Sequence, residues 1–229
     1  MLEIKKLCKA YGSKTIINDW NYRFETGKIY GLIGRNGIGK TTILKCISGL
    51  IIPDNAEIFT EKGDLSGEDY LNRNIIYVND EPIYYHNLTV QEHFWLVCKV
   101  EKYTKKEAEE AITFYTNRLH MKEYLNYYPS ALSKGTLQRM MLIMGFLRRS
   151  PNLLLDEPFN GLDPVQLDEI IQICNEERKQ RCLIISSHDI ESLAELCDEY
   201  LVLGANGIRI FSDKIDRNIV NQMIGDSYV

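Results

Sequence analysis

A glycine-rich segment has the residue types and spacing of a site for phosphate groups. Gly34 to Thr41 reads GRNGIGKT and fits the pattern GxxxxGK(S/T) in full. Glycines let backbone N–H groups turn towards an anion, and the N-terminus of a following helix adds partial positive charge. Lys40 can then reach the β and γ phosphates of a nucleotide, and the Thr41 hydroxyl can ligate Mg²⁺. The pattern predicts a nucleoside triphosphate site.

The flanking residues favour this interpretation over a glycine-rich turn with an unrelated lysine. An apolar strand pattern, Ile29 to Ile33, precedes the loop, and Thr42 to Ile47 reads as the start of a helix. We expect the whole loop to bind nucleotide. Its residues are Gly34, Arg35, Asn36, Gly37, Ile38, Gly39, Lys40, Thr41 and Thr42.

Two carboxylates follow another apolar run. Asn152 to Pro158 reads NLLLDEP, a buried strand that ends in Asp156 and Glu157. In a phosphate-loop protein an Asp at a strand end can hold Mg²⁺, directly or through water. The adjacent Glu157 could polarise the water that attacks the γ phosphate, which is typically worth ~10²–10⁴-fold in rate. Taken alone, the pair also fits an ordinary acidic turn.

A histidine ends a similar strand. Leu183 to His188 reads LIISSH, so His188 falls at the carboxyl edge of the predicted sheet, where α/β sheets place their ligands. A structural histidine is the alternative, and the position favours a functional one.

The elements that must position these residues are short β-rich runs between helical stretches. Continuous apolar segments suit strands covered on both faces, as in a parallel sheet. The N-terminal residues alternate more and predict a small antiparallel sheet. The runs are Lys28–Ile33, Asn74–Val78, Asn152–Leu155, Cys182–Ser186 and Tyr200–Leu203.

The region from about residue 79 to 150 reads as helical. Thr104 and Glu107 form a capping box, and helical spacing follows at Ala108, Ala111, Ile112, Tyr115 and Leu119. A second helix is predicted from Ser133 or Gly135 to Arg149, stopped by Pro151. We therefore predict an α/β fold with a phosphate-loop core in residues 1–78 and 151–229, with 79–150 as an inserted helical subdomain.

Composition points to an ordinary globular protein. The chain has 229 residues, 45% of them hydrophobic, and a net charge of -5, which argues against nucleic acid as the main partner. The first ten residues lack an apolar signal core, and no stretch approaches the ~20 apolar residues of a membrane span. The six cysteines form no CxxC pair, so we expect reduced thiols in a cytoplasmic protein.

The ordered motifs make the chain resemble the nucleotide-binding domain of ABC transporters. The order is Tyr11, the phosphate loop, LSKGT at 132–136, the acidic pair, GLDP at 161–164 and His188. Asn206 and Gly207 resemble the family's closing hairpin. The resemblance implies an ATPase with ATP and Mg²⁺ as cofactors, working as a head-to-tail homo- or heterodimer.

The resemblance also implies roles for single residues. Tyr11 would stack on adenine, Lys40 and Glu157 would serve catalysis, and His188 would sense the γ phosphate. Ser133 and Gly135 would contact the ATP held by a second subunit, and Asp163 would lie across the same dimer seam. Thr41 and Asp156 would hold Mg²⁺.

Two departures from the family pattern affect these expectations. The usual LSGGQ reads LSKGT, with Lys134 and Thr136, and similar variants occur in exporter subunits whose membrane domain is a separate chain. Asp80 stands where the family carries Gln. An Asp can still ligate Mg²⁺, but it brings negative charge beside Asp156, so slow turnover is an open alternative.

The resemblance implies an integral membrane permease subunit as partner and a peripheral location at the inner face of the membrane. Tyrosines are concentrated between Tyr77 and Tyr128, and aromatic residues suit interfaces. We predict that Tyr84, Tyr85 or Trp95 lines the permease groove, although each could instead fill the subdomain core.

Three functions stay open. The first is an ATPase subunit that powers transport, with export favoured by the signature variant. The second is a soluble ABC-type ATPase acting on DNA, ribosomes or iron–sulfur assembly. The third is a nucleotide-dependent regulator with little turnover. The coiled-coil or zinc insertions and second ATPase domains of non-transport relatives are not found in these 229 residues, which favours transport.

Overall fold

The structure is a computed structural model that describes residues 1–60, 63–64, 74–204 and 207–212. Contacts within the chain divide it into two compact units. The core unit consists of residues Met1–Tyr77, Ser150–Glu157 and the chain from Arg178 onward. The helical unit consists of Val78–Arg149 and Pro158–Glu177.

The first sheet of the core unit is antiparallel, as predicted. Its strands are β1 (Leu2–Tyr11), β2 (Lys14–Phe24), β4 (Asn55–Thr60) and β5 (Gly63–Asp64), in the order β2-β1-β4-β5. Strands β1 and β2 form a hairpin in which Tyr11 pairs with Lys14. Gly12 in the turn has a φ of 58°, which glycine adopts at little cost. The hairpin thus presents Tyr11 at its tip.

The second sheet is mainly parallel and carries the predicted site. Its strands are β3 (Ile29–Ile33), β6 (Ile75–Val78), β7 (Asn152–Asp156), β8 (Cys182–Ser187), β9 (Glu199–Gly204) and β10 (Gly207–Phe211). The order is β10-β9-β3-β8-β7-β6. Strand β10 pairs antiparallel with β9, whereas β3 pairs parallel with β8 and β9, and β7 pairs parallel with β8. In register, Ile33 lies opposite Ser187, and Asp156 lies opposite Ser186. The carboxyl ends of β3, β7 and β8 therefore meet at one edge, which brings their loops together.

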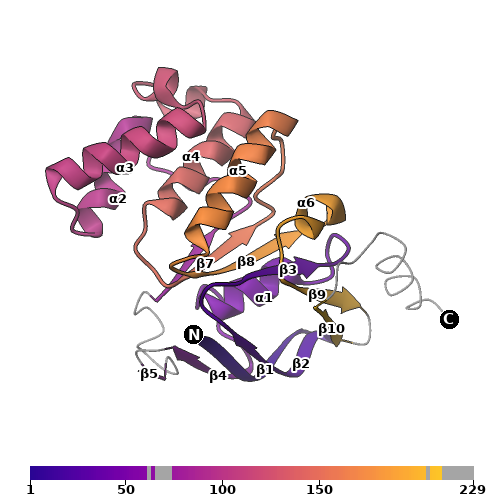
Figure 1. Ribbon diagram of the computed structural model, residues 1–229. Coiled ribbons are helices and arrows are strands. Elements are labelled where there is room, and N and C mark those ends of the chain that lie inside the picture. Colours follow the sequence, from indigo (N-terminus) through magenta and orange to yellow (C-terminus); the bar gives the residue numbers. More distant parts are fainter. Residues whose placement is uncertain (61–62, 65–73, 205–206, 213–229) are drawn as a thin grey trace. The chain divides into compact units, whose positions relative to one another are not determined.

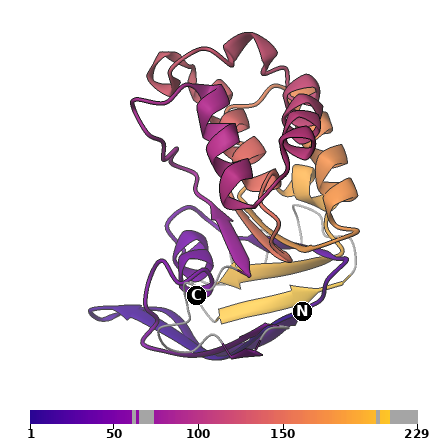
Figure 2. The same cartoon turned by 90° about the vertical axis from the view of Figure 1, so that its left-hand side faces the viewer.

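Two helices cover this sheet. Helix α1 (Lys40–Ile47) lies between the two sheets of the core unit (Figures 1 and 2), and its buried residues join the hydrophobic core formed by both. Helix α6 (Ile190–Ala194) covers the other face, because a Cβ on Gly31 in β3 would meet the Leu193 side chain at 3.3 Å. Covering on both faces explains why β3 is buried at every residue. Strands β7 and β8 are also buried at every residue.

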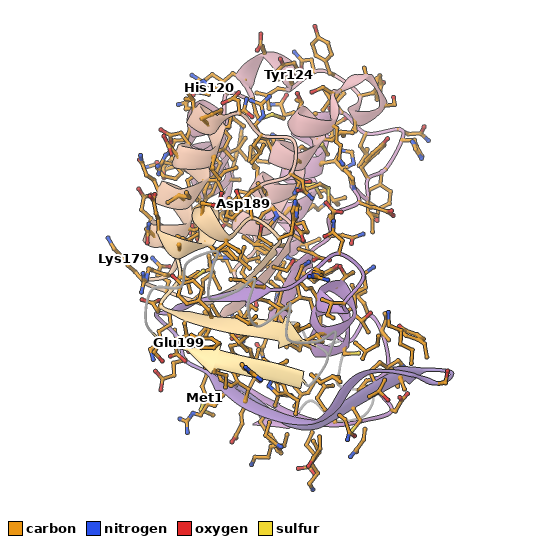
Figure 3. The ribbon with its side chains drawn as sticks, turned by 90° about the vertical axis from the view of Figure 1, so that its right-hand side faces the viewer. Met1, His120, Tyr124, Lys179, Asp189 and Glu199 are labelled. Atoms are coloured by element: carbon orange, nitrogen blue, oxygen red, sulfur yellow. The ribbon has the colours of Figure 1, made fainter. Side chains whose placement is uncertain are left out.

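The helical unit contains four helices and two short 3-10 turns. They are α2 (Val90–Val100), α3 (Lys105–Arg118), η2 (Lys122–Tyr124), η3 (Pro129–Ala131), α4 (Lys134–Phe146) and α5 (Pro164–Glu177). Tyr115 of α3 stacks on Phe146 of α4 and donates to Glu177 of α5 at 2.5 Å. Thr104 and Glu107 form the predicted capping box of α3. His120 and Tyr124 lie beyond the end of α3 (Figure 3).

Some predicted boundaries differ from the structure. Helix α4 begins after Ser133, as predicted, but ends at Phe146 rather than Arg149. Arg148 and Arg149 instead bond to Glu101, which draws the chain out of the helix. The helical unit also includes residues 158–177, which we had expected in the α/β core. Helix α2 has a capping box of its own, formed by Thr89 and Glu92, which was not among the predicted helix starts.

Strands β9 and β10 form the hairpin expected near the end of the chain, although Asn206 lies outside the described residues. Among the described helices, none combines the length and the apolar character needed to cross a membrane.

Candidate nucleotide-binding site

The phosphate loop connects the buried strand β3 to helix α1. Gly37 and Gly39 have φ angles of 76° and 127°, which residues with a Cβ rarely adopt. A Cβ on Gly39 would also lie 2.4 Å from Cγ2 of Ile16 in β2. Glycine is therefore required at position 39 for two reasons, its backbone conformation and the close approach of β2. The loop has the backbone form that a phosphate cradle needs.

Lys40 is held at the base of this loop. Its Nζ donates to the Gly34 carbonyl at 2.8 Å and lies 3.1 Å from Oε1 of Glu157. Only 5% of the Lys40 side chain is exposed. A buried ammonium needs an anionic partner, and Glu157 supplies it in this structure. Phosphate oxygens are the other anions that this position suits.

Glu157 connects Lys40 to His188. Its Oε2 lies 2.8 Å from Nδ1 of His188, whose side chain is half exposed. The Glu157 backbone has a φ of 46°, unusual for a residue with a side chain. Its N–H donates to the carbonyl and to Oγ of Ser186 in β8. Strand β8 therefore fixes the unusual backbone that aims the Glu157 carboxylate at Lys40 and His188.

Asp156 is fully buried beside this cluster. Its Oδ1 accepts a hydrogen bond from Ser186 at 2.5 Å, and its Oδ2 accepts one from Tyr77 at 2.7 Å. A carboxylate offers about four lone-pair sites, so two remain for a cation or its water. Thr41 is exposed in the first turn of α1. In the described part of the chain, no three His, Cys, Asp or Glu residues cluster as a metal site. The remaining lone pairs of Asp156 and the exposed Thr41 hydroxyl are oxygen ligands, which fit a Mg²⁺ ion that takes its other ligands from phosphate and water.

The β1–β2 hairpin flanks the loop. Half of the Tyr11 side chain is exposed, and the Lys9 ammonium lies 5.3 Å from the centre of its ring. Across the hairpin, Lys14 donates to the Gly37 carbonyl at 3.1 Å. The hairpin and the phosphate loop are thus in direct contact, and the half-exposed Tyr11 ring lies at the tip of the hairpin.

The other predicted residues lie in the helical unit. Ser133 caps α4 through the Thr136 amide, and Thr136 is buried with its hydroxyl 2.8 Å from that of Ser133. A Cβ on Gly135 would lie 2.5 Å from the Gly161 carbonyl, so only glycine fits there. Asp163 caps the start of α5 by accepting from the Gln166 amide at 2.9 Å.

Asp80 also belongs to this unit, and it accepts a hydrogen bond from Asn160 at 3.2 Å. The predicted residues therefore form two groups. The core unit brings together Tyr11, the loop, Lys40, Asp156, Glu157 and His188. The helical unit holds Ser133, with Gly135 beside Gly161, and also holds Asp80 and Asp163.

Three contacting residues escaped the sequence analysis: Lys14, Tyr77 and Ser186. Lys14 follows directly on the hairpin turn after Tyr11, and Ser186 lies two residues before His188. The sequence around these residues does not indicate their contacts, because each bonds to a residue that is far away in the chain.

Comparisons with known proteins agree with this geometry. Residues 17–160, more than half of the chain, match the family model described as ABC transporter. The ABC-type transporter ATP-binding protein EcsA of Bacillus subtilis is 27% identical over 91% of this chain and 85% of its own. The carnitine transport ATP-binding protein OpuCA of Listeria monocytogenes is 30% identical over 99% of this chain, which spans 59% of OpuCA.

Solved structures give the same answer. An ATP-binding subunit of an ABC transporter superposes with a TM-score of 0.85 at 26% identity, over all of this chain and 95% of that one. The ATP-binding cassette MJ0796, solved as a dimer with ADP and Pi, matches in fold, with a TM-score of 0.80 at 22% identity over 93% of this chain and 98% of that one. The chain with this phosphate loop and this Lys40–Glu157–His188 cluster therefore belongs to the ABC transporter family, as one of its ATP-binding ATPases.

Proposed function

We propose that the chain hydrolyses Mg-ATP in a head-to-tail dimer and so drives transport through a separate integral membrane permease. The observation that carries the proposal is the bridging of Lys40 and His188 by Glu157, directly beside the phosphate loop. Phosphoryl transfer to water uses a cation that binds the phosphates and a group that orients or deprotonates the attacking water, and a histidine bonded to that group can orient it.

The loop amides and Lys40 would bind the phosphates. When phosphate oxygens take over Lys40, one oxygen of Glu157 is released and can accept a proton from the attacking water. His188 keeps hold of the other oxygen through Nδ1, so the carboxylate stays oriented. Bound Mg²⁺ would supply charge neutralisation at the β and γ phosphates, held by Thr41 and, through water, by Asp156.

Asp80 is proposed as a third group on the Mg²⁺ and γ phosphate side. Its carboxylate is kept in place by Asn160. The variant Asp80→Ala should lower ATP turnover and shift its Mg²⁺ dependence, with Asp168→Ala, an exposed Asp of α5, as control. If Asp80→Ala has the same ATP turnover and Mg²⁺ dependence as the wild type, Asp80 does not belong to the Mg²⁺ and γ phosphate site.

Ser133, Gly135 and Asp163 are proposed to act on the nucleotide of a second subunit, which could be a like or an unlike copy. Ser133 is exposed at the N-terminus of α4, and no acidic residue stands in the first turn of that helix. Lys134 adds positive charge there, which suits phosphate oxygens. ATP and ADP would then be distinguished by the contacts that the γ phosphate alone provides, as a switch requires.

The permease is proposed to attach to the aromatic part of the helical unit. Trp95 lines a hollow of about 490 Å³ together with Leu88, Leu96 and Tyr103. Tyr85 is exposed in the segment before α2, and Tyr84 is half-buried beside it. The chain would thereby be held at the inner face of the membrane. Export is proposed from the LSKGT signature alone.

Replacing Tyr84 and Tyr85 with Ala should weaken permease binding in a co-purification assay. Phe114→Ala, which removes one exposed aromatic ring from α3, is the control. If the Tyr84 and Tyr85 double variant binds the permease as well as Phe114→Ala does, the two tyrosines do not form the permease contact.

The decisive experiment is capture of partners with Glu157→Gln in Mg-ATP. This change should slow hydrolysis and prolong the ATP-bound state. Glu109→Gln makes the same chemical change at an exposed site on α3 and serves as control. Recovery of a multi-spanning membrane protein with Glu157→Gln would support transport.

Two other functions predict different outcomes. A soluble ABC-type ATPase acting on DNA, ribosomes or iron–sulfur assembly would bring those components down without a membrane chain. A nucleotide-dependent regulator would bind ATP with little turnover. Lys40→Ala would then weaken ATP binding, and there would be no measurable hydrolysis rate for it to lower. Intact Lys40, Asp156, Glu157 and His188 favour turnover.

A further inference from the structure

Two hydroxyl groups hold the buried Asp156 carboxylate from opposite sides. Ser186 in β8 donates to Oδ1 at 2.5 Å, and Tyr77 in β6 donates to Oδ2 at 2.7 Å. Asp156 and Ser186 have no exposed surface, and Tyr77 is half-buried. Each oxygen of the carboxylate thus has its own donor, and the plane of the group is fixed.

Ser186 also contacts the neighbouring acidic residue. Its Oγ accepts a hydrogen bond from the Glu157 N–H at 3.0 Å while it donates to Asp156. One hydroxyl therefore links the carboxylate of Asp156 to the backbone of Glu157, whose φ of 46° needs support. Ser186 is therefore positioned to orient both Asp156 and Glu157.

We propose that Tyr77 and Ser186 are positioning residues that aim Asp156 at the Mg²⁺ of bound ATP, with Ser186 also orienting Glu157. This inference rests on the proposed Mg²⁺ role of Asp156. Metal-binding carboxylates are commonly hydrogen-bonded in turn, and loss of such a partner typically costs about 10–100-fold in metal affinity or activity. A buried carboxylate that loses one donor can also rotate away from its working direction.

The test compares the affinity of a fluorescent ATP analogue in Mg²⁺ and in EDTA, for the whole chain and its variants. The ratio of the two dissociation constants reports how strongly the protein uses the metal. Tyr77→Phe and Ser186→Ala should each lower this ratio by about tenfold, towards the value of Asp156→Asn. The dissociation constant in EDTA should stay within about twofold, because the phosphate loop is untouched.

The chain provides matched controls. Tyr22→Phe removes a Tyr–carboxylate bond of 2.6 Å to Glu199, and Ser192→Ala removes a Ser–carboxylate bond of 2.5 Å to Asp189. Both carboxylates are labelled in Figure 3. These variants should leave the ratio unchanged. Ser186→Ala should in addition lower the turnover number at saturating Mg-ATP more than Tyr77→Phe does, because it alone also removes one of the two bonds that hold the Glu157 N–H.

The outcomes separate this inference from the proposed function. If Asp156→Asn lowers the ratio while Tyr77→Phe and Ser186→Ala do not, the positioning roles are overturned and the Mg²⁺ role of Asp156 stands. If Asp156→Asn leaves the ratio unchanged, the Mg²⁺ role fails and the positioning roles fail with it. Should Ser186→Ala not fold, Tyr77→Phe, which loses one oxygen and keeps its ring, decides the matter.

Discussion

Two neighbouring residues at the start of α4 have opposite surroundings. Gly135 lies against the Gly161 carbonyl, whereas Lys134 is exposed to solvent. Steric room thus explains how a lysine can replace the family's glycine at position 134 while position 135 stays glycine. Lys134 therefore adds a positive charge at an exposed position of the helix start.

Gly135→Ala should therefore destabilise the protein by about 1–3 kcal/mol, because its Cβ would meet backbone that cannot rotate away. Urea unfolding measures the change. Lys134→Ala, at the adjacent exposed position, should stay within about 0.5 kcal/mol of the wild type. Equal effects of the two variants would contradict the close approach to Gly161.

Lys14 is a second residue whose contact makes a prediction. Its ammonium holds the Gly37 carbonyl, so Lys14→Ala should loosen the phosphate loop and weaken ATP binding by about two- to tenfold, the range of one ordinary hydrogen bond. Equilibrium binding of ATP checks this. Lys106→Ala, which removes the same charge from an exposed position of α3, should bind ATP like the wild type.

At the scale of elements, the start of α3 is held by one acidic side chain. Glu107 accepts from the backbone N–H and the hydroxyl of Thr104, and Arg149 donates to its other oxygen. These bonds, that from the Thr104 backbone first, lower the Glu107 pKa from 4.5 to about 2. The ionised form is the one that the fold stabilises.

This lowered pKa has a definite consequence for acid stability. The contribution of Glu107 is fully present above the ordinary pKa of 4.5 and is lost as the pH falls through about 2. Glu107→Gln should be less stable than the wild type at about pH 5, and the difference should shrink at about pH 3. Urea unfolding at both pH values measures it.

Glu109→Gln, on the same helix, serves as the control and should show no such change with pH. A Glu107→Gln difference that grows on acidification would contradict the predicted sign.

At the scale of the whole molecule, the thiols report on packing. All six cysteines are free, and Cys46, Cys98, Cys174 and Cys182 are buried. Burial raises the pKa of Cys182 to about 12, and burial likewise raises the pKa of Cys46 and of Cys98 to about 11. The thiolate, which is the reactive form, is therefore scarce at these positions.

In the native protein at about pH 8, a thiol-reactive reagent should label Cys8 and Cys197 first. The four buried thiols should react only as the chain unfolds, so their labelling rate should follow urea unfolding. Prompt labelling of all six thiols in buffer would contradict the packing described for both units.

Much of the fold and of the site follows from local patterns. The strand before the phosphate loop, the capping box at Thr104 and the strand ending in Asp156 were all predicted where the structure has them. Such signals are local because periodicity and capping depend on residues within a few positions of each other. The end of α4 was misplaced because distant Glu101, not local sequence, captures Arg148 and Arg149.

The sequence by itself determined which residues could handle a nucleotide, because the order and spacing of the phosphate loop, the acidic pair and His188 need no structure to be read. Only the tertiary structure decided how those residues are held. Ser186 reaches Asp156 because β7 and β8 are neighbours in a given register, and Tyr77 comes from β6. Register and strand order depend on the packing of the whole sheet, so no local pattern can name the hydroxyl groups that hold a buried carboxylate.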